Sequence, residues 1–319
     1  MADQGSGAPP SEEPPSPAPD AAEEKAALQA AKNRTGMLLM ALAMGAFSLN
    51  DTMTKATSAE LPTGEILAIR GAFAVAMLAP IVIYRYGLRA IPRAYSRPLL
   101  IRNVAEIFGA WLFLSALFRL PLANVVSILQ TLPLTMTAAA ALLFREPVGW
   151  RRWTAASVGL LGVLLIVQPG SADFSWWYLA AIVSVVFITI RDVATKFIAN
   201  TTPSLVITFV TAAVVMIAGI LLGMTETWSV PSTGAVAKLA AAAVLVLVGY
   251  YTLIECWREA EISAVAPFRY TIVLWAMLLG YLVLGELPSL WTAIGSLIVV
   301  GAGLYTFHRE RVRKTRDRS

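Results

Sequence analysis

The string Asp51-Thr-Met-Thr-Lys55 returns as Asp192-Val-Ala-Thr-Lys196, with its aspartate, threonine and lysine at the same spacing. Each copy closes the first long apolar stretch of one half of the chain. The same offset of 141 residues matches Pro62 with Pro203, and an offset of 140 matches Val125, Thr131, Leu134, Leu142 and Glu146 with Val265, Thr271, Leu274, Leu282 and Glu286. The chain is therefore a duplicated unit.

The composition is that of a protein embedded in lipid. Hydrophobic residues make up 57% of the 319 residues and charged residues only 14%, and the mean hydropathy is +0.68. Soluble domains carry about 25% charged residues. The sequence therefore predicts an integral membrane protein, and its apolar segments leave too little chain for a separate water-soluble catalytic domain.

Apolar runs bounded by charged residues, proline or glycine predict an all-α polytopic protein with ten transmembrane helices. We place the spans at 35–56, 64–84, 98–118, 121–143, 152–168, 175–198, 203–223, 235–257, 262–284 and 288–308. They form a first five-helix repeat at 34–168 and a second at 175–308. A disordered cytoplasmic tail at 1–33 and a basic cytoplasmic tail at 309–319 are expected on either side.

Basic residues predict the orientation of the spans. They concentrate at 85–97, at 145–152 and in the tail from 309, whereas the first, fifth and seventh connections have almost none. Positively charged connections stay in the cytoplasm, so both termini are expected there. Because five is an odd number of crossings, the second unit enters the membrane upside down relative to the first. We therefore expect two inverted five-helix repeats.

Several classes of chemistry are excluded by residue usage. The single cysteine, Cys256, excludes an internal disulfide and a cysteine-cluster metal site, and the lone histidine, His308, lies at the end of the last span. No Gly-x-x-x-x-Gly-Lys-Ser/Thr string for binding a nucleotide is present. We expect neither metal nor cofactor. The net charge of +5 follows from the basic connections, so nucleic-acid binding is not expected.

Three features together carry a resemblance to a known family. They are the repeated Asp51-x-x-x-Lys55, the stretch Leu120-Pro-Leu-Ala-Asn124 leading to Pro133, and Phe144-Arg-Glu146 followed by Gly159-x-x-Gly162. Over residues 35–308 this pattern resembles the EamA-type transporters of the drug/metabolite transporter superfamily. It is similar to the bacterial branch that includes S-adenosylmethionine and riboflavin uptake carriers.

The resemblance implies a multi-pass protein of the bacterial inner membrane. It implies ten helices in two inverted halves, with a central cavity lined mainly by the first, third, fourth, sixth, eighth and ninth spans. The expected partners are a small-molecule substrate and the lipid bilayer, and the expected state is a monomer or weak homodimer. The second half departs from the pattern, because Pro133 aligns with Val273 and the nearby proline is Pro267.

Ionisable residues within the spans are the first candidates for the transport pathway. A charge at mid-bilayer costs about 2.5–3.5 kcal/mol on insertion scales, so each one needs a partner, water or a function. Residues spaced four apart share a helix face, as do Asp51 with Lys55, Asp192 with Lys196, and Arg102 with Glu106. Each pair is either a structural ion pair or a gate or substrate clamp. Recurrence in both inverted halves favours matched inner and outer gates.

Further candidates are polar or aromatic side chains within the spans. They are Asn50, Trp111, Gln130, Arg191, Tyr250, Tyr251, Glu255, Arg269, Tyr270 and Trp275. Such aromatic residues are either anchors at the lipid interface or walls of a pocket for a small molecule with a flat or apolar part.

The sequence thus predicts a secondary transporter that moves a small organic metabolite by alternating access. An excess of positive charge within the spans favours an amino-acid-like, carboxylate-bearing or aromatic heterocyclic substrate over a cation. Protons are a candidate coupling ion, with Glu106 and Glu255 as their carriers. Two alternatives stay open: a flippase-like carrier of a lipid-linked substrate, and a polytopic membrane enzyme, for which no nucleophile or metal cluster is visible.

Overall fold

The computed structural model describes residues 19–143, 150–171, 174–195, 197–199, 201–260 and 265–316, and within these ranges every regular element is helical. The first half contains α1 (Pro19–Lys55), α2 (Thr63–Tyr86), α3 (Ala90–Arg93), α4 (Arg97–Leu117), α5 (Leu122–Leu129), α6 (Leu132–Leu143) and α7 (Trp150–Val167). The second half contains α8 (Trp177–Thr195), α9 (Ser204–Gly223), α10 (Thr233–Glu259), the 3-10 helix η1 (Ala266–Tyr270), α12 (Thr271–Leu284) and α13 (Leu290–Arg316).

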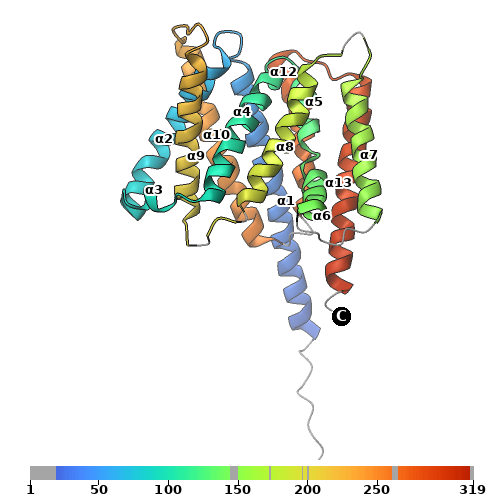
Figure 1. The fold of residues 1–319 in the computed structure, drawn as a ribbon. Helices are drawn as coiled ribbons and strands as arrows, with labels where there is room; N and C mark the ends of the chain where they lie inside the picture. The colour runs from blue at the N-terminus through green and yellow to red at the C-terminus, as the bar shows by residue number, and fades with distance from the viewer. Residues whose placement is uncertain are drawn as a thin grey trace, which may run out of the picture.

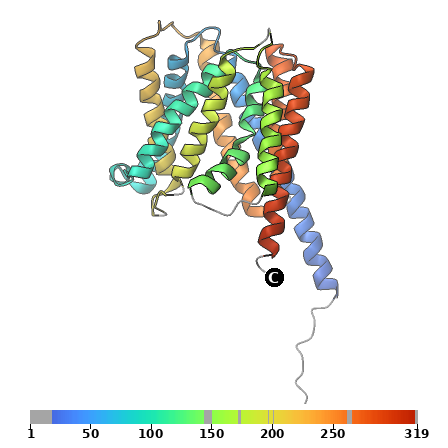
Figure 2. The ribbon, with the colours of Figure 1, turned by 45° about the vertical axis from the view of Figure 1, so that its right-hand side comes forward.

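These elements form ten spans, as the apolar pattern predicts. Eight segments of the described chain are long and apolar enough to cross a membrane, and two shorter apolar helices lie at Trp153–Val167 and Leu290–Tyr305. The fourth span is made of α5 followed by α6, and the ninth of η1 followed by α12. Figures 1 and 2 show the spans side by side in one bundle, with α3 as a short helix at its edge. The prediction of a ten-helix polytopic membrane protein is confirmed.

Both ends of the chain extend beyond the expected spans as helix. Residues 19–33, which the sequence assigns to a disordered tail, are the first part of α1, and α13 continues through the basic residues to Arg316. Alanine, glutamate, lysine and glutamine favour helix, and an existing apolar helix removes the cost of starting a new one. Figure 1 shows both extensions leaving the bundle at the same end. We call this the tail end, and the end where α1 finishes at Lys55 the far end.

The two repeats run in opposite directions through the bundle. The repeat-mates α2 and α9 are antiparallel, because Gly64 at the start of α2 lies against Gly223 at the end of α9. The mates α7 and α13 are antiparallel too, since the backbone of Gly162 meets that of Gly295. The repeat-mate of α1 is α8, and that of α10 is α4. The packing of α1 on α10 therefore has its equivalent in the packing of α8 on α4. The inverted arrangement predicted from the odd number of spans is therefore present.

Two spans are interrupted at the same repeat position. The break between α5 and α6 falls at Thr131, and that between η1 and α12 at Thr271, its mate at the offset of 140. Each threonine hydroxyl donates a hydrogen bond of 2.7 Å to the carbonyl three residues earlier, that of Ile128 or Phe268. The sequence treats both spans as continuous. Each half instead provides one segmented span, in which the threonine side chain adds a hydrogen bond to a carbonyl that also accepts from the backbone nitrogen of the same threonine.

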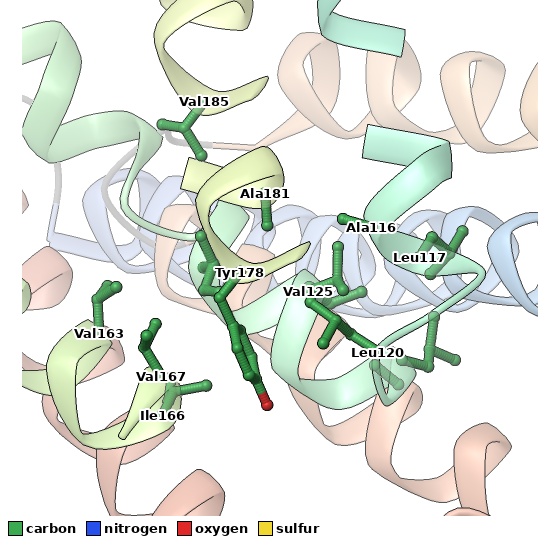
Figure 3. Close-up of a cluster of buried hydrophobic side chains, with 14 of the residues drawn as sticks. Ala116, Leu117, Leu120, Val125, Val163, Ile166, Val167, Tyr178, Ala181 and Val185 are labelled. Carbon is green, nitrogen blue, oxygen red and sulfur yellow. The ribbon is translucent and has the colours of Figure 1, made fainter. Parts of the chain in front are cut away.

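The largest apolar core lies toward the far end, where α4, α5, α7 and α8 meet. Figure 3 shows Leu117 and Leu120 on one side and Val163 and Val167 on the other, with the ring of Tyr178 between these groups. All five side chains are buried. In lipid such packing stabilises the bundle through close contact rather than through removal of apolar surface from water.

The α2–α9 contact provides a stability prediction. A Cβ at Gly219 would lie 2.5 Å from the backbone nitrogen of Ala68 and 2.8 Å from the carbonyl oxygen of Gly64, so Gly219→Ala must push the two backbones apart. We expect a loss of about 1–3 kcal/mol in the free energy of unfolding. Gly301→Ala is the matched control, because nothing lies within 4 Å of a Cβ there. Thermal unfolding of the purified variants in detergent measures the difference, and an unchanged melting temperature for Gly219→Ala would contradict the packing argument.

Candidate functional site

A buried ion pair closes the far end of the bundle. Lys55 is 9% exposed, forms a salt bridge with Glu286 in the α12–α13 connection, and donates to the carbonyl of Leu120. The second carboxylate oxygen of Glu286 accepts from the backbone nitrogen of Leu122 at 2.7 Å. The pair therefore joins the end of α1, the start of α5 and the connection before α13. We call Lys55 and Glu286 the far-end latch.

This latch replaces the expected pairing of Lys55 with Asp51. The spacing of four residues on one helix favoured a local pair, but Lys55 turns to a carboxylate 231 positions away. Glu286 is the repeat-mate of Glu146, but it is not among the site residues predicted from the sequence. The repeat offset was the signal that could have identified it, because it aligns one acidic residue in each half with the connection after the fourth or ninth span.

A second polar layer lies just inside the latch. The amide of Asn124 donates to the hydroxyl of Tyr178 at 2.5 Å, and its oxygen accepts from Thr292 at 2.9 Å. One turn further along α5, Ser127 is 2.7 Å from Ser296. The side chains of this layer are buried, and the ring of Tyr178 belongs to the apolar core of Figure 3. The layer holds α5 against α8 and α13, so the far end is closed by hydrogen bonds as well as by the ion pair.

A cluster of charged side chains joins α4 and α8 nearer the tail end. The guanidinium of Arg191 donates to Glu106 at 3.0 Å and to its neighbour Asp192 at 2.8 Å. Arg102 donates to the hydroxyl of Thr195 at 3.0 Å and to that of Thr211 on α9. The expected pairing of Arg102 with Glu106 along one helix is thus replaced by bonds between helices. Arg102 donates hydrogen bonds to neutral hydroxyls, whereas both carboxylates accept hydrogen bonds from Arg191.

Asp51 lies on α1 one turn before the latch. The amide of Asn50 donates to its carboxylate at 2.9 Å, and Arg70 on α2 acts on it electrostatically. Asn50 is 3% exposed, and its amide oxygen has no hydrogen-bond partner among the described residues; the same holds for the hydroxyl of Ser48.

The structure gives other candidate residues packing contacts. Trp275 lies against Gly45 and donates from its indole nitrogen to the carbonyl of Ala41 at 3.0 Å, while Tyr270 covers Gly303. The ring of Tyr250 meets Phe47 edge-on, with centroids 5.2 Å apart. These contacts hold α12 and α10 against α1, and η1 against α13.

The remaining candidates are dispersed or outside the described part. Gln130 is buried at the break between α5 and α6, whereas Trp111 and Arg269 are exposed. Lys196 lies outside the described residues, and so do the side chains of Tyr251 and Glu255 on α10. The hydroxyl groups of Thr195 and Thr211 bind Arg102, and Thr211 also donates to Asn103. Asn103 and Thr211 are not among the predicted site residues, because uncharged polar residues are common in membrane helices. Thr195 is the threonine of the repeated string, and that repetition is the signal that could have identified it.

The charge balance of the described interior is more even than the sequence suggests. Lys55 is neutralised by Glu286, and Arg191 is shared by Glu106 and Asp192. Arg102 balances the second carboxylate of the cluster, but its direct hydrogen bonds go to neutral hydroxyls. Across the described residues no group of three histidine, cysteine, aspartate or glutamate side chains is placed to hold a metal ion.

Comparison with known proteins reveals relatives that are transporters. The chain is 25% identical to an S-adenosylmethionine uptake transporter of Rickettsia prowazekii (strain Madrid E), over 86% of this chain and 93% of that protein. It is 25% identical to a riboflavin transporter of Rhizobium johnstonii, over 90% and 96% of the two chains. It is 27% identical to a pseudopaline exporter of Pseudomonas aeruginosa (strain UCBPP-PA14), over 84% and 94%.

The fold also matches that of a solved protein structure. The TM-score is 0.61 at 19% sequence identity, and the match covers 87% of this chain and 98% of that one. A model of the EamA-like transporter family matches residues 34–168 and again residues 175–307, one match to each half of the inverted bundle. The chain belongs to the EamA-like transporter family.

Proposed function

We propose that the protein is a secondary carrier of the bacterial inner membrane that moves a small organic metabolite by alternating access. The observation that carries this proposal is the presence of two polar clusters at different depths of an inverted bundle: the far-end latch and the Asn124 layer join the helices at the far end, while the charged cluster lies toward the tail end. Inverted halves provide a symmetric pair of states in which the closed end changes sides. The family membership and the transporter relatives support it.

The charge distribution supports an orientation with the tail end in the cytoplasm. Arg85, Arg89 and Arg97 are exposed at the tail end, between α2 and α4, where both helical extensions of the chain also leave the bundle. Positively charged connections are retained on the cytoplasmic side. In this orientation the latch closes the outer side, and the path to the charged cluster lies on the inner side.

Arg102 supports a substrate that carries a carboxylate or another anionic group. The guanidinium of Arg102 donates hydrogen bonds to the neutral hydroxyls of Thr195 and Thr211. An anionic substrate can therefore replace a hydroxyl as the acceptor without first breaking a direct ion pair. A charge-assisted hydrogen bond stabilises binding by about 1.5–3 kcal/mol. S-adenosylmethionine carries a sulfonium and an ammonium besides its carboxylate, and the carboxylates that could bind these two cations, Glu106 and Asp192, are engaged by Arg191. An organic anion, or a neutral heterocycle such as riboflavin, suits the cluster better.

Counterflow in proteoliposomes tests the substrate class. We expect exchange of radiolabelled phenylpyruvate or riboflavin and none of S-adenosylmethionine. Arg102→Gln should raise the half-saturation concentration for the anion by about ten- to hundredfold, because one charge-assisted hydrogen bond is lost. Arg89→Gln, in an exposed connection, is the control and should leave exchange unchanged. Exchange of S-adenosylmethionine alone, or an Arg102→Gln variant with wild-type saturation, would contradict the assignment.

Thiol labelling tests whether the latch closes the outer side. Ser127 is fully buried beneath it, so Ser127→Cys in a Cys256→Ser background should resist a membrane-impermeant maleimide added outside. Glu286→Gln removes the charge partner of Lys55 and leaves a buried ammonium unpaired, which costs about 3–5 kcal/mol and favours the open far end. Labelling of Ser127→Cys should then rise severalfold. Equal labelling with and without Glu286→Gln would show that the latch does not control access.

A further inference from the structure

Equivalent aspartates in the two repeats have different hydrogen-bond donors. The offset of 141 residues aligns Asn50 with Arg191 and Asp51 with Asp192. In each pair the preceding side chain donates to the aspartate, at 2.9 Å from Asn50 and at 2.8 Å from Arg191. The geometry is the same, but the donor is a neutral amide in the first repeat and a permanent cation in the second.

The donor decides which protonation state each aspartate can hold. Arginine has donors only, so it stabilises Asp192 as a carboxylate and offers a protonated carboxyl no acceptor. An amide has a donor and an acceptor, and its two ends can exchange by a flip of the side chain. The oxygen of Asn50 has no partner among the described residues and is available to accept the O–H of a protonated Asp51. Asn50 can therefore satisfy Asp51 in both states.

The charged groups around Asp51 leave it without a bound counter-ion. On its own helix, Lys55 is engaged by Glu286 and by the carbonyl of Leu120. From α2, Arg70 acts on Asp51 electrostatically. From α12, Tyr281 lies at a similar level but is 55% exposed. On η1, Arg269 is exposed and Tyr270 is directed at Gly303.

The remaining neighbour, α10, is apolar at this level. Gly36 contacts Ala260 and Phe47 contacts Gly249, so these antiparallel helices place Leu245 opposite Asp51. The acidic positions of α10, 255 and 259, fall ten and fourteen residues away along that helix, at least about 15 Å at the rise of an α-helix. Glu106, the other carboxylate predicted to carry protons, is committed to Arg191.

We propose that Asp51 is the site that binds and releases the coupling proton, an inference that rests on the proposed carrier function. Its carboxylate takes up a proton from water when the far end is open, and the neutral acid then hydrogen-bonds to the Asn50 oxygen. Asp51 lies one turn inside the latch, so breaking the Lys55–Glu286 pair is the step that exposes it to the outer side. Burial of the neutral acid avoids the cost of carrying a carboxylate through the closed state.

Infrared spectroscopy of the full-length protein in lipid vesicles tests this without a substrate. Difference spectra between buffers at about pH 6 and about pH 8, above the range in which exposed carboxyl groups titrate, should contain the carbonyl band of a protonated carboxyl group, which shifts on exchange into heavy water. Asp51→Asn should lose this band, Asp192→Asn should keep it, and Asp51→Glu should restore it. An Asp51→Asn variant that keeps the full band, or loss of the band in Asp192→Asn alone, would overturn the proposal. Asp51→Glu also shows whether a loss reflects misfolding, because it retains the carboxyl group.

A transport measurement separates this inference from the carrier function. Proteoliposomes containing Asp51→Asn should exchange riboflavin or phenylpyruvate across the membrane without a gradient, at near wild-type rate, but should not accumulate either compound when a pH gradient is imposed. Gradient-driven accumulation at the wild-type level would overturn the role of Asp51 while leaving the carrier function in place. Absence of exchange by the wild-type protein for every compound would instead count against the carrier function, and the infrared band would still report on Asp51.

Discussion

Polar groups in a lipid-embedded bundle must find their partners within the protein, and this constraint explains most of the interior described above. Glu286 binds an ammonium and a backbone nitrogen at once, and Asn124 uses both ends of its amide. Thr131 and Thr271 bond to the backbone where their spans are broken. No water is available in the hydrocarbon layer to replace such bonds. The polar residues of this chain are therefore concentrated where helices meet.

The same constraint explains why closure and binding are separated in space. Neutralised groups, such as Lys55 with Glu286, suit an end that must exclude ions and water. Groups that retain unused bonding capacity are costly in a sealed interior. Examples are Arg102 between two hydroxyls and Asn50, whose amide oxygen has no partner in the part of the chain that the structure describes. A carrier can keep them because a substrate or a proton satisfies them during part of its cycle.

Much of the fold could be predicted from the sequence, because apolar length and repeat offset are properties of the chain alone. The ten spans and their inversion both follow from them. The pairings within the candidate site could not be predicted in the same way. Spacing of four residues suggested Lys55 with Asp51 and Arg102 with Glu106, yet Lys55 and Glu106 find their partners on other elements. Local spacing shows only which residues share a face, whereas the packing of distant helices decides which charge lies opposite. The breaks at Thr131 and Thr271 were missed because an apolar run has the same hydropathy whether it is continuous or interrupted.

The glycine contacts between repeat-mates have a consequence for the conformational cycle. Contacts of α2 with α9 and of α7 with α13 join equivalent helices, so they lie on the pseudo-twofold axis that relates the halves. An operation that exchanges the halves converts each of these contacts into itself, but converts the α1–α10 contact into the α8–α4 contact. The packing of helix pairs on the axis is therefore the same in the two end states. Pairs off the axis exchange their packing, so that each adopts in one state the geometry that its mate has in the other. In the proposed carrier cycle the glycine-lined interfaces would serve as fixed pivots, a role that suits backbones packed there too closely to accept even a methyl group.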